Sequence, residues 1–273
     1  MLGKCLENVK EKLPLVHNIT NYVTVNDVAN ALLACGSSPI MSDEPDDVAD
    51  ITAICGGLNI NIGTLNQRSI EAMFVAGKKA GELGHIVLLD PVGAGASKLR
   101  TDTAIRIMDT IKPDIIRGNI SEIKTLAIGF GTTKGVDADK ADIVTQDNLE
   151  EMIDFAKNFS KKANAIIAIT GAIDLVADSE KCYVIYNGRP EMSKITGTGC
   201  QLSGVITAYA VANADNKTKA VAAAVCMMGL AGEIGCANLL PGEGNSTLRN
   251  RIIDAIYNMD SETLNKGAKY EVR

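Results

Sequence analysis

The sequence predicts an α/β fold in which a mostly parallel sheet is flanked by helices. Short apolar runs alternate with longer segments of helical periodicity, the pattern produced by successive βαβ units. The absence of Trp, an aromatic content of 4% and 25 glycines are typical of a helix-rich α/β enzyme. With 273 residues, 46% of them apolar, the chain can bury one substantial core. We therefore expect a single domain over residues 1–273.

Apolar runs that are bounded by turn residues are expected to form the strands. Strands of a parallel sheet carry helices on both faces, so each should be buried on both sides. Two later runs, 173–177 and 182–186, alternate around a polar turn and predict an antiparallel hairpin at one edge of the sheet. The parallel strands are expected at 16–18, 39–41, 58–62, 86–90, 115–117 and 165–170.

Segments with a 3.6-residue apolar period are expected to form the helices between these strands. Gly36 and Gly84 follow two of them and are typical helix stops. The aperiodic stretch 129–145 reads as a surface excursion, and the chain should end in an exposed polar tail. Helices are expected within 1–12 and at 24–35, 66–83, 122–128, 147–160, 201–212, 217–239 and 246–258.

Charge and apolar content argue against nucleic acid and membrane as partners. The net charge is −6, and the 27 basic residues are scattered instead of forming a stripe. The most apolar stretch, 220–240, is rich in Ala and Gly and contains Glu233, so it is expected to be a buried core helix. The N-terminal residues lack the uninterrupted apolar run of a signal peptide. A small-molecule ligand is the expected partner.

The cysteines indicate a reducing compartment. There are seven, an odd number, at irregular spacings without a Cys-x-x-Cys pair, and only two histidines accompany them. Neither a disulfide framework nor a zinc site is supported by this pattern. A cytoplasmic location is therefore expected, with most of these thiols acting as small core residues.

A glycine-rich segment, Gly197-Thr198-Gly199-Cys200, stands immediately before the predicted helix 201–212. Unpaired backbone N–H groups and the positive end of a helix bind anions, and glycine lets a phosphate approach closely. A tight loop without a ligand is the alternative. The segment is a candidate phosphate-binding site.

Two further sites lie where predicted strands end. Asp90 closes one strand and Arg117 another, with Glu122 five residues after Arg117. Each has a plain structural explanation, since Asp90 could cap a turn and Asn119 or Ser121 could cap the helix that contains Glu122. Together with the glycine-rich helix start, however, two carboxylates and one arginine are the parts that phosphoryl transfer requires. Mg²⁺, held partly through water by the carboxylates, is the expected cofactor.

Several short motifs occur in the order seen in the hydroxyethylthiazole kinases of thiamin salvage, and the resemblance extends over nearly the whole chain. It implies a three-layer ribokinase-like fold and transfer of the γ-phosphate of MgATP to the hydroxyl of 4-methyl-5-(2-hydroxyethyl)thiazole. It also implies a homotrimer with active sites between subunits. The motifs are Asn18-Ile19-Thr20-Asn21, Pro39-Ile40-Met41-Ser42, Asn61-Ile62-Gly63-Thr64, Asp90-Pro91-Val92-Gly93, Arg117-Gly118-Asn119-x-x-Glu122 and Gly197-Thr198-Gly199-Cys200.

The same resemblance implies roles for individual residues. The thiazole pocket would be lined by one set of residues and completed by Gly197 and Cys200 from across an interface. Cys200, with Gly197 and Gly199, would be catalytic. The pocket set is Asn21, Met41 and Gly63; the nucleotide contacts are Arg117, Thr170 and Thr198; the metal ligands are Asp90 and Glu122.

Cys200 is the most diagnostic residue, because ribokinase relatives end their glycine loop in a catalytic aspartate. A thiol at a helix N-terminus is expected to have a lowered pKa, which would make it a base for the alcohol proton, although nearby phosphates act in the opposite direction. The alternative is a packed thiol. His17 and His85 are expected to be structural, and the acidic run 43–47 to be a solvated helix start.

Other functions remain open from the residues alone. A kinase for hydroxymethylpyrimidine or pyridoxal would use the same fold and mechanism. Nucleotide-dependent hydrate dehydratases share the fold but carry the aspartate in the loop. A protein that binds thiazole or nucleotide without turnover is the third alternative.

Overall fold

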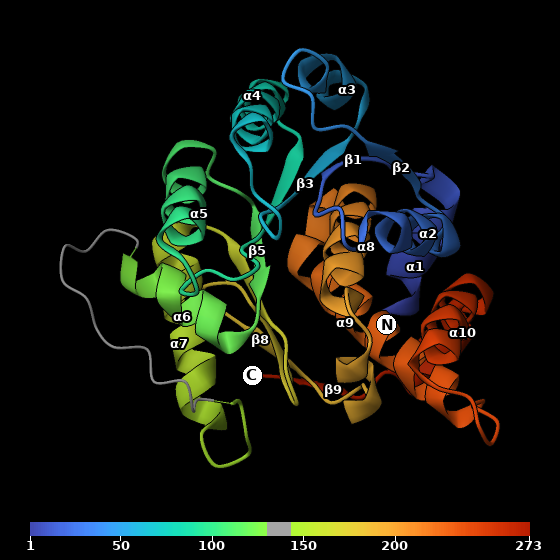
Figure 1. Cartoon of the computed structure of the whole chain (residues 1–273). Coiled ribbons are helices and arrows are strands. Elements are labelled where there is room, and N and C mark those ends of the chain that lie inside the picture. The colour runs from blue at the N-terminus through green and yellow to red at the C-terminus, as the bar shows by residue number, and fades with distance from the viewer. Residues whose placement is uncertain (130–142) are drawn as a thin grey trace.

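The computed structural model describes residues 1–129 and 143–273, so most of the expected surface excursion at 129–145 lies outside the described residues. Its centre is a nine-stranded sheet with the order β2-β1-β3-β4-β5-β6-β7-β8-β9. Figure 1 shows helices covering both faces of this sheet, which confirms the predicted α/β class. The strands are β1 Leu15–Ile19, β2 Ser38–Met41, β3 Gly57–Asn61, β4 Ile86–Asp90, β5 Ile115–Gly118, β6 Ile166–Ile169, β7 Asp174–Ala177, β8 Cys182–Ile185 and β9 Tyr270–Val272.

Strands β1 to β6 run parallel, and β7 to β9 add antiparallel strands at one edge. The predicted parallel strands and the hairpin are confirmed. One expectation was wrong. The edge strand β2 is only partly buried, since a single neighbour flanks it. The C-terminal tail is largely exposed as expected, but it also forms a strand that was not predicted, β9, which pairs with β8, where Tyr183 opposes Val272.

One helical layer packs on the face that carries Val16, Leu88, Ile115 and Val176. Its centre is formed by α8 and α9, which contact the sheet directly, while α2 and α10 lie alongside them. The predicted helices of this layer are confirmed within a few residues, and α11 is additional. The layer consists of α1 Gly3–Lys12, α2 Val25–Cys35, α8 Thr198–Ala212, α9 Lys217–Ala237, α10 Asn245–Asn258 and α11 Ser261–Gly267, with short 3₁₀ turns at Pro190–Lys194 and Ala214–Asn216.

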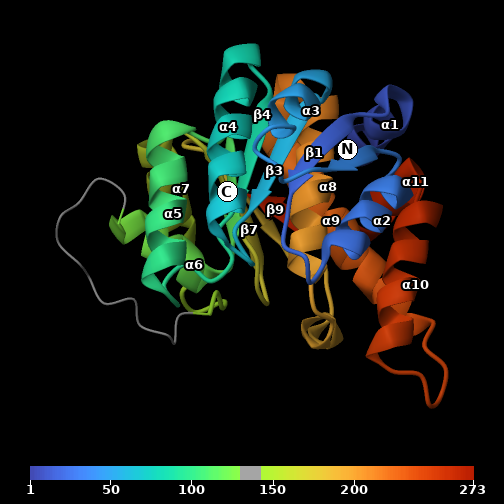
Figure 2. The same ribbon diagram turned by 45° about the horizontal axis from the view of Figure 1, so that its top comes forward.

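The second layer packs on the opposite face, against Leu58, Ile60, Leu89 and Ile167. Figure 2 shows the sheet between the two layers. Helix α5 was not predicted, although Ser97 caps it by accepting a hydrogen bond from the Arg100 amide. The layer consists of α3 Val48–Ile54, α4 Gln67–Leu83, α5 Lys98–Thr110, α6 Ile120–Gly129 and α7 Leu149–Ala163.

In the described part of the chain, one helical segment, Ala214–Ala237, is long and apolar enough to cross a membrane. Within the protein, 78% of its most apolar window is buried. It packs between the sheet and α8 and α10, which explains why its apolar residues are not confined to one face. The expectation of a buried core helix is confirmed.

The order of the strands indicates where in the sheet a ligand site is expected. From β1 the chain moves to β2 on one side, and β3 then pairs with the other side of β1. The connections therefore diverge at the carboxyl ends of β1 and β3, and open α/β sheets bind ligands in the crevice at such a point. Asn21 follows β1 and Asn61 ends β3, so both stand beside this crevice.

Candidate active site

Helix α8 begins at the expected glycine-rich segment. Gly197 is its N-cap residue, with φ +87°, and an added Cβ would meet the Thr24 side chain. Among the described residues, no side chain caps this helix end. Since the first amides of a helix lack partners within the helix, this end offers N–H groups to an anion. Glycine is required at position 197 both for the backbone conformation and for space.

Asp90 ends β4 and is fully buried. Its Oδ2 accepts hydrogen bonds from Asn61 Nδ2 (2.8 Å) and Ser203 Oγ (2.7 Å), and Arg117 Nη1 lies 3.5 Å away. Its Oδ1 is buried without a hydrogen-bond partner among the described residues. Burial raises the pKa of Asp90 to about 6, although the charge of Arg117 acts against this rise. The second oxygen is thus available to a ligand.

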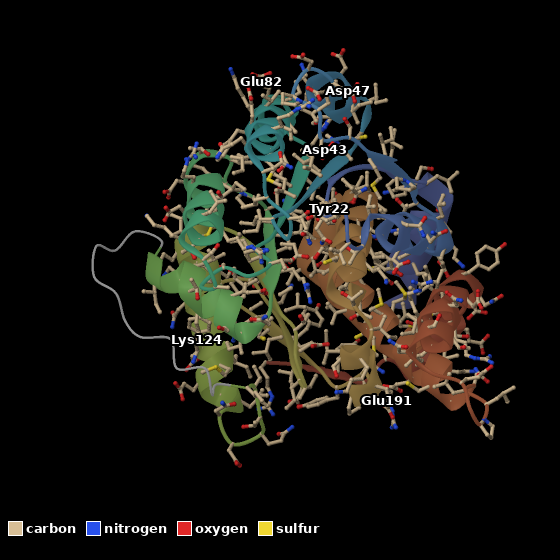
Figure 3. The ribbon with its side chains drawn as sticks, viewed as in Figure 1. Tyr22, Asp43, Asp47, Glu82, Lys124 and Glu191 are labelled. Carbon is tan, nitrogen blue, oxygen red and sulfur yellow. The ribbon has the colours of Figure 1, made fainter. Side chains whose placement is uncertain are left out.

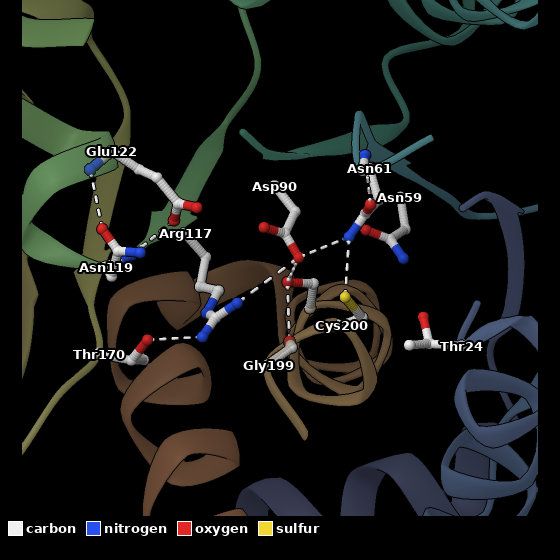
Figure 4. Close-up of polar contacts among 12 residues, drawn as sticks. Thr24, Asn59, Asn61, Asp90, Arg117, Asn119, Glu122, Thr170, Gly199 and Cys200 are labelled. Carbon is white, nitrogen blue, oxygen red and sulfur yellow. Dashed lines mark hydrogen bonds and ion pairs between the residues drawn. The ribbon is translucent and has the colours of Figure 1, made fainter. Parts of the chain in front are cut away.

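Arg117 lies between Asp90 and the end of β6, as Figure 4 shows. Its Nη2 donates to Thr170 Oγ1 (2.5 Å) while Nη1 faces the Asp90 carboxylate. The guanidinium lies against Gly199, where an added Cβ would be 2.5 Å from Nη1. The glycine therefore gives the arginine its place at the start of α8.

A cavity of about 530 Å³ opens beside this arginine. Three predicted nucleotide-binding residues, Arg117, Thr170 and Thr198, line it together with Gly199. The opposite wall comes from α9 and is apolar, which suits a flat aromatic ring. That wall includes Val225, Met228 and Gly229.

Asp174 also lines this cavity and was missed in the sequence. Its Oδ1 accepts a hydrogen bond from the Gly171 amide (2.8 Å). Burial raises the pKa of Asp174 to about 7, above the opposing effects of that hydrogen bond and of Arg117. The only signal in the sequence was a carboxylate at the start of a predicted strand.

Cys200 lies in the first turn of α8 and is buried. Its Sγ accepts hydrogen bonds from Asn21 Nδ2 (3.2 Å) and Asn61 Nδ2 (3.3 Å). Burial and the neighbouring Asp90 raise the pKa of the thiol. The expectation of a lowered pKa was wrong, because desolvation and a nearby carboxylate outweigh the helix N-terminus and the amide donors.

The residues expected around the thiazole are partly brought together. Asn21 contacts Cys200 and lies close to Gly63, where an added Cβ would be 3.0 Å from the Asn21 Cβ. The expected approach of Cys200 to Asn21 from across an interface was wrong, because the two side chains meet within one chain. Met41 ends the edge strand β2, level with Asn18 of β1, and takes no part in these hydrogen bonds.

Glu122 lies in the first turn of α6. Its two oxygens accept hydrogen bonds from the Gly93 amide (2.8 Å) and the Asn119 amide (2.9 Å), and Asn119 Oδ1 accepts from the Glu122 amide (2.9 Å). This is a reciprocal helix cap that also holds the turn after Asp90. Glu122 therefore has the structural role that was given as its alternative, because both of its oxygens accept hydrogen bonds from backbone amides.

The residues at the carboxyl ends of β4 and β5 fit Mg²⁺ better than they fit a transition metal. Among residues 1–129 and 143–273, there is no group of three or more His, Cys, Asp or Glu side chains that could hold a metal ion. Mg²⁺ does not need such a cage, because it keeps water and takes one or two carboxylates plus phosphate oxygens. The buried, unpartnered Oδ1 of Asp90 supplies one such oxygen.

The remaining polar candidates have structural surroundings. His17 is buried, with Nδ1 2.9 Å from Thr52 Oγ1 and Nε2 3.0 Å from the Ser42 carbonyl, and burial lowers its pKa. All seven cysteines lie within the described residues and are free thiols. Figure 3 shows Asp43 and Asp47 at the exposed approach to α3, which confirms a solvated helix start.

Comparison with known proteins agrees with this geometry. A structure from Pyrococcus horikoshii, described as a hydroxyethylthiazole kinase protein, superposes with a TM-score of 0.87 at 31% identity, covering 100% of this chain and 98% of that one. A Staphylococcus aureus pyridoxal kinase, solved with AMP-PCP and pyridoxal, gives a TM-score of 0.62 at 14% identity over 96% and 99% of the two chains. The fold is therefore that of the ribokinase-like kinases.

Sequence comparison is more specific. Residues 6–262 match the model of the hydroxyethylthiazole kinase family. A hydroxyethylthiazole kinase from Clostridium acetobutylicum is 58% identical over 271 residues, which cover 99% of each chain. The chain belongs to the hydroxyethylthiazole kinase family.

Proposed function

We propose that this protein transfers the γ-phosphate of ATP to the hydroxyl of 4-methyl-5-(2-hydroxyethyl)thiazole in thiamin biosynthesis or salvage. One observation supports this function above all. The buried Cys200 sulfur accepts hydrogen bonds from two asparagine amides, and one of these, Asn61, also donates to Asp90 beside Arg117. These contacts support an acceptor pocket next to the groups that would carry out phosphoryl transfer.

The nucleotide would occupy the cavity beside Arg117. Its phosphates would meet the open amides at the start of α8, with Thr198 and Gly199 lining the approach. Arg117, fixed by Thr170, carries a positive charge toward the transferred phosphoryl group. Charge develops on the phosphoryl oxygens in the transition state, so a fixed guanidinium there lowers the barrier.

The thiazole would lie against Asn21, Met41 and Gly63 with its hydroxyl toward Cys200. Burial and Asp90 raise the pKa of the thiol, so the thiolate, the form that can accept a proton, is the minor form at neutral pH. The transition state of phosphoryl transfer is largely dissociative, so the acceptor proton leaves late. The thiolate form of Cys200, whose negative sulfur the Asn21 and Asn61 amides would stabilise, would then take that proton and become a neutral thiol. Gly197 leaves room for the Thr24 side chain, and Gly199 leaves room for the Arg117 guanidinium.

Mg²⁺ would be held by Asp90, with Glu122 contributing through water, and would neutralise charge on the phosphates. The chain's own part is to leave Asp90 Oδ1 without a hydrogen-bond partner among the described residues while three side chains hold Oδ2. Those side chains are Asn61, Ser203 and Arg117.

We also propose a homotrimer, in which a neighbouring subunit covers the open side of the thiazole pocket, and a cytoplasmic location. Tyr22, labelled in Figure 3, is 76% exposed and Val23 is 60% exposed, directly after Asn21. Exposed apolar side chains at a pocket mouth favour coverage by another chain. Seven free thiols suit a reducing compartment. Each chain would act as one domain.

The test is ADP release with MgATP and three alcohols: hydroxyethylthiazole, hydroxymethylpyrimidine and pyridoxal. Thiazole-dependent ADP release, with a phosphate monoester seen by phosphorus NMR, is the expected result. Turnover with another alcohol only would replace the substrate but keep the mechanism. Thiazole binding without ADP release would instead indicate a binding protein.

A further inference from the structure

Asn61 is the last residue of β3 and stands opposite Asp90 of β4 in the sheet register. Its side chain is 1% exposed and faces the start of α8, where Cys200 lies. It takes part in more hydrogen bonds than any other side chain described for this site. They are Nδ2 to Asp90 Oδ2 (2.8 Å) and to Cys200 Sγ (3.3 Å), and Oδ1 from Asn21 Nδ2 (3.0 Å) and from the Gly63 amide (2.9 Å).

The orientation of this amide follows from its partners. The Gly63 backbone N–H can only donate, so the atom it meets must be the carbonyl oxygen of Asn61. An ionised Asp90 carboxylate can only accept, so the atom it meets must be the amide nitrogen. Both ends give the same assignment. The oxygen side of Asn61 thus faces the acceptor pocket, and the nitrogen side faces the reacting groups.

We propose that Asn61 is a positioning residue, whose amide nitrogen holds the Cys200 sulfur and the Asp90 carboxylate while its oxygen holds Asn21 and Gly63. The inference rests on the proposed kinase function and deepens it. The Asn61 side chain then fixes the position of the acceptor pocket relative to the phosphoryl-transfer groups. Removing the Asn61 side chain would change the distances between the acceptor pocket and the phosphoryl-transfer groups, and the rate of phosphoryl transfer depends steeply on such distances.

The neighbouring strand position shows that the arrangement is specific to residue 61. Asn59 lies two residues earlier in β3, on the same face, and is equally buried. Its Nδ2 donates to Asn18 Oδ1 (3.0 Å), and its own Oδ1 has no partner among the described residues. Figure 4 shows Asn59 beside Asn61, with the dashed lines to Asp90 and Cys200 leaving from Asn61. Asn59 is therefore a matched control for the loss of a buried amide.

The experiment compares Asn61→Ala with Asn59→Ala. Each hydrogen bond to a group that is charged during the reaction is worth roughly a tenfold to hundredfold change in rate. We expect Asn61→Ala to lower kcat by about tenfold or more and to weaken thiazole binding, measured by calorimetry without ATP, by about fivefold. Asn59→Ala should stay within about twofold in both, at a similar melting temperature.

A double-mutant cycle tests whether Asn61 acts through the sulfur. In a Cys200→Ala background, Asn61→Ala should cost several times less in kcat than in the wild type, because one of its partners is already gone. Equal costs in the two backgrounds would overturn the assignment to the thiol. If Asn61→Ala and Asn59→Ala lower kcat and thiazole affinity equally, the positioning role is wrong.

Failure of the proposed function gives a different result. If the wild type releases no ADP with thiazole, the kinase assignment falls before any variant is compared. If the wild type turns over and only the Asn61 effects are missing, the function stands and this inference alone fails.

Discussion

The Arg117 guanidinium lies against the Cα of Gly199, where an added Cβ would be 2.5 Å from Nη1 and 2.6 Å from Nη2. The obstructing atoms belong to the end of a flexible side chain, so they can move away at little cost to folding. If the guanidinium moves, however, Arg117 loses its hydrogen bond to Thr170 and its ion pair with Asp90. A substitution of Gly199 should therefore lower activity while leaving the stability of the fold nearly unchanged.

We expect Gly199→Ala to keep or slightly raise the melting temperature, since alanine is favoured over glycine by up to about 1 kcal/mol inside a helix. The kcat/KM for ATP should fall by about a hundredfold, the effect expected when one charge-assisted hydrogen bond is missing from the transition state. Gly81→Ala is the control, because no described atom lies within 4 Å of its added Cβ. Full activity in Gly199→Ala would contradict the place given to Arg117.

Gly197→Ala should behave differently and unfold the protein more easily. The left-handed backbone at φ +87° costs alanine about 1–2 kcal/mol, and contact of the new methyl with the Thr24 side chain adds roughly 1–3 kcal/mol. Gly242→Ala, at φ +90° with no described atom within 4 Å, should show the backbone cost alone.

Urea unfolding curves of the two variants separate these contributions. Because the Thr24 methyl is the nearest obstacle at position 197, Thr24→Ser should restore part of the stability that Gly197→Ala removes. Equal destabilisation at positions 197 and 242 would mean that Thr24 is not an obstacle.

Cys200→Ala should weaken turnover by about tenfold to a hundredfold without abolishing it, at or below the low end of the range of about 10²–10⁴-fold for general bases. Burial and Asp90 raise the thiol pKa, so the sulfur is protonated at neutral pH and becomes a better base as the pH rises. The wild-type kcat should therefore increase from pH 7 to 9, and that slope should disappear in Cys200→Ala. An identical slope in both enzymes would remove the thiol from the reaction.

Asp174 should make ATP binding depend on pH. Its pKa is raised to about 7, so the carboxyl is neutral below that pH and negative above it. A negative charge in the wall of the cavity repels the triphosphate, so the KM for ATP should rise between pH 6 and 8. Asp174→Asn should flatten this rise. The same pH profile in the variant would assign the effect to ATP itself.

The sequence predicted much of the fold because local signals and tertiary structure agree. Helix α4 begins after Asn66, which forms a capping box with Ser69, and ends before Gly84 in a left-handed conformation, as the residue types indicate. Strand β4 has the predicted bounds because five buried apolar and acidic positions follow one another without a turn residue. Helix α8 begins at Thr198 and so starts earlier than predicted. The weak helix propensities of Thr198 and Gly199 favoured a loop at these positions.

The predicted chemical groups also met at one edge of the sheet, since strands of a parallel sheet carry their carboxyl ends to the same side. Asp90, Arg117 and Thr170 end or follow neighbouring strands, and Cys200 arrives from α8. The local cap between Asn119 and Glu122 was among the alternatives, but the pattern could not show that Glu122 also accepts a hydrogen bond from the Gly93 amide, because Gly93 lies in a different loop.

The sequence by itself determined the α/β alternation, the helix ends and the glycine-rich start of α8, since each depends on residues close together in the chain. Tertiary structure decided the pairing of β9 with β8, the raised pKa values of Cys200 and Asp174, and the four hydrogen bonds of Asn61. These depend on burial and on partners far away in the sequence. A local sequence pattern predicts neither the burial of a side chain nor its distant partners, because both arise only when the helical layers and the sheet pack together.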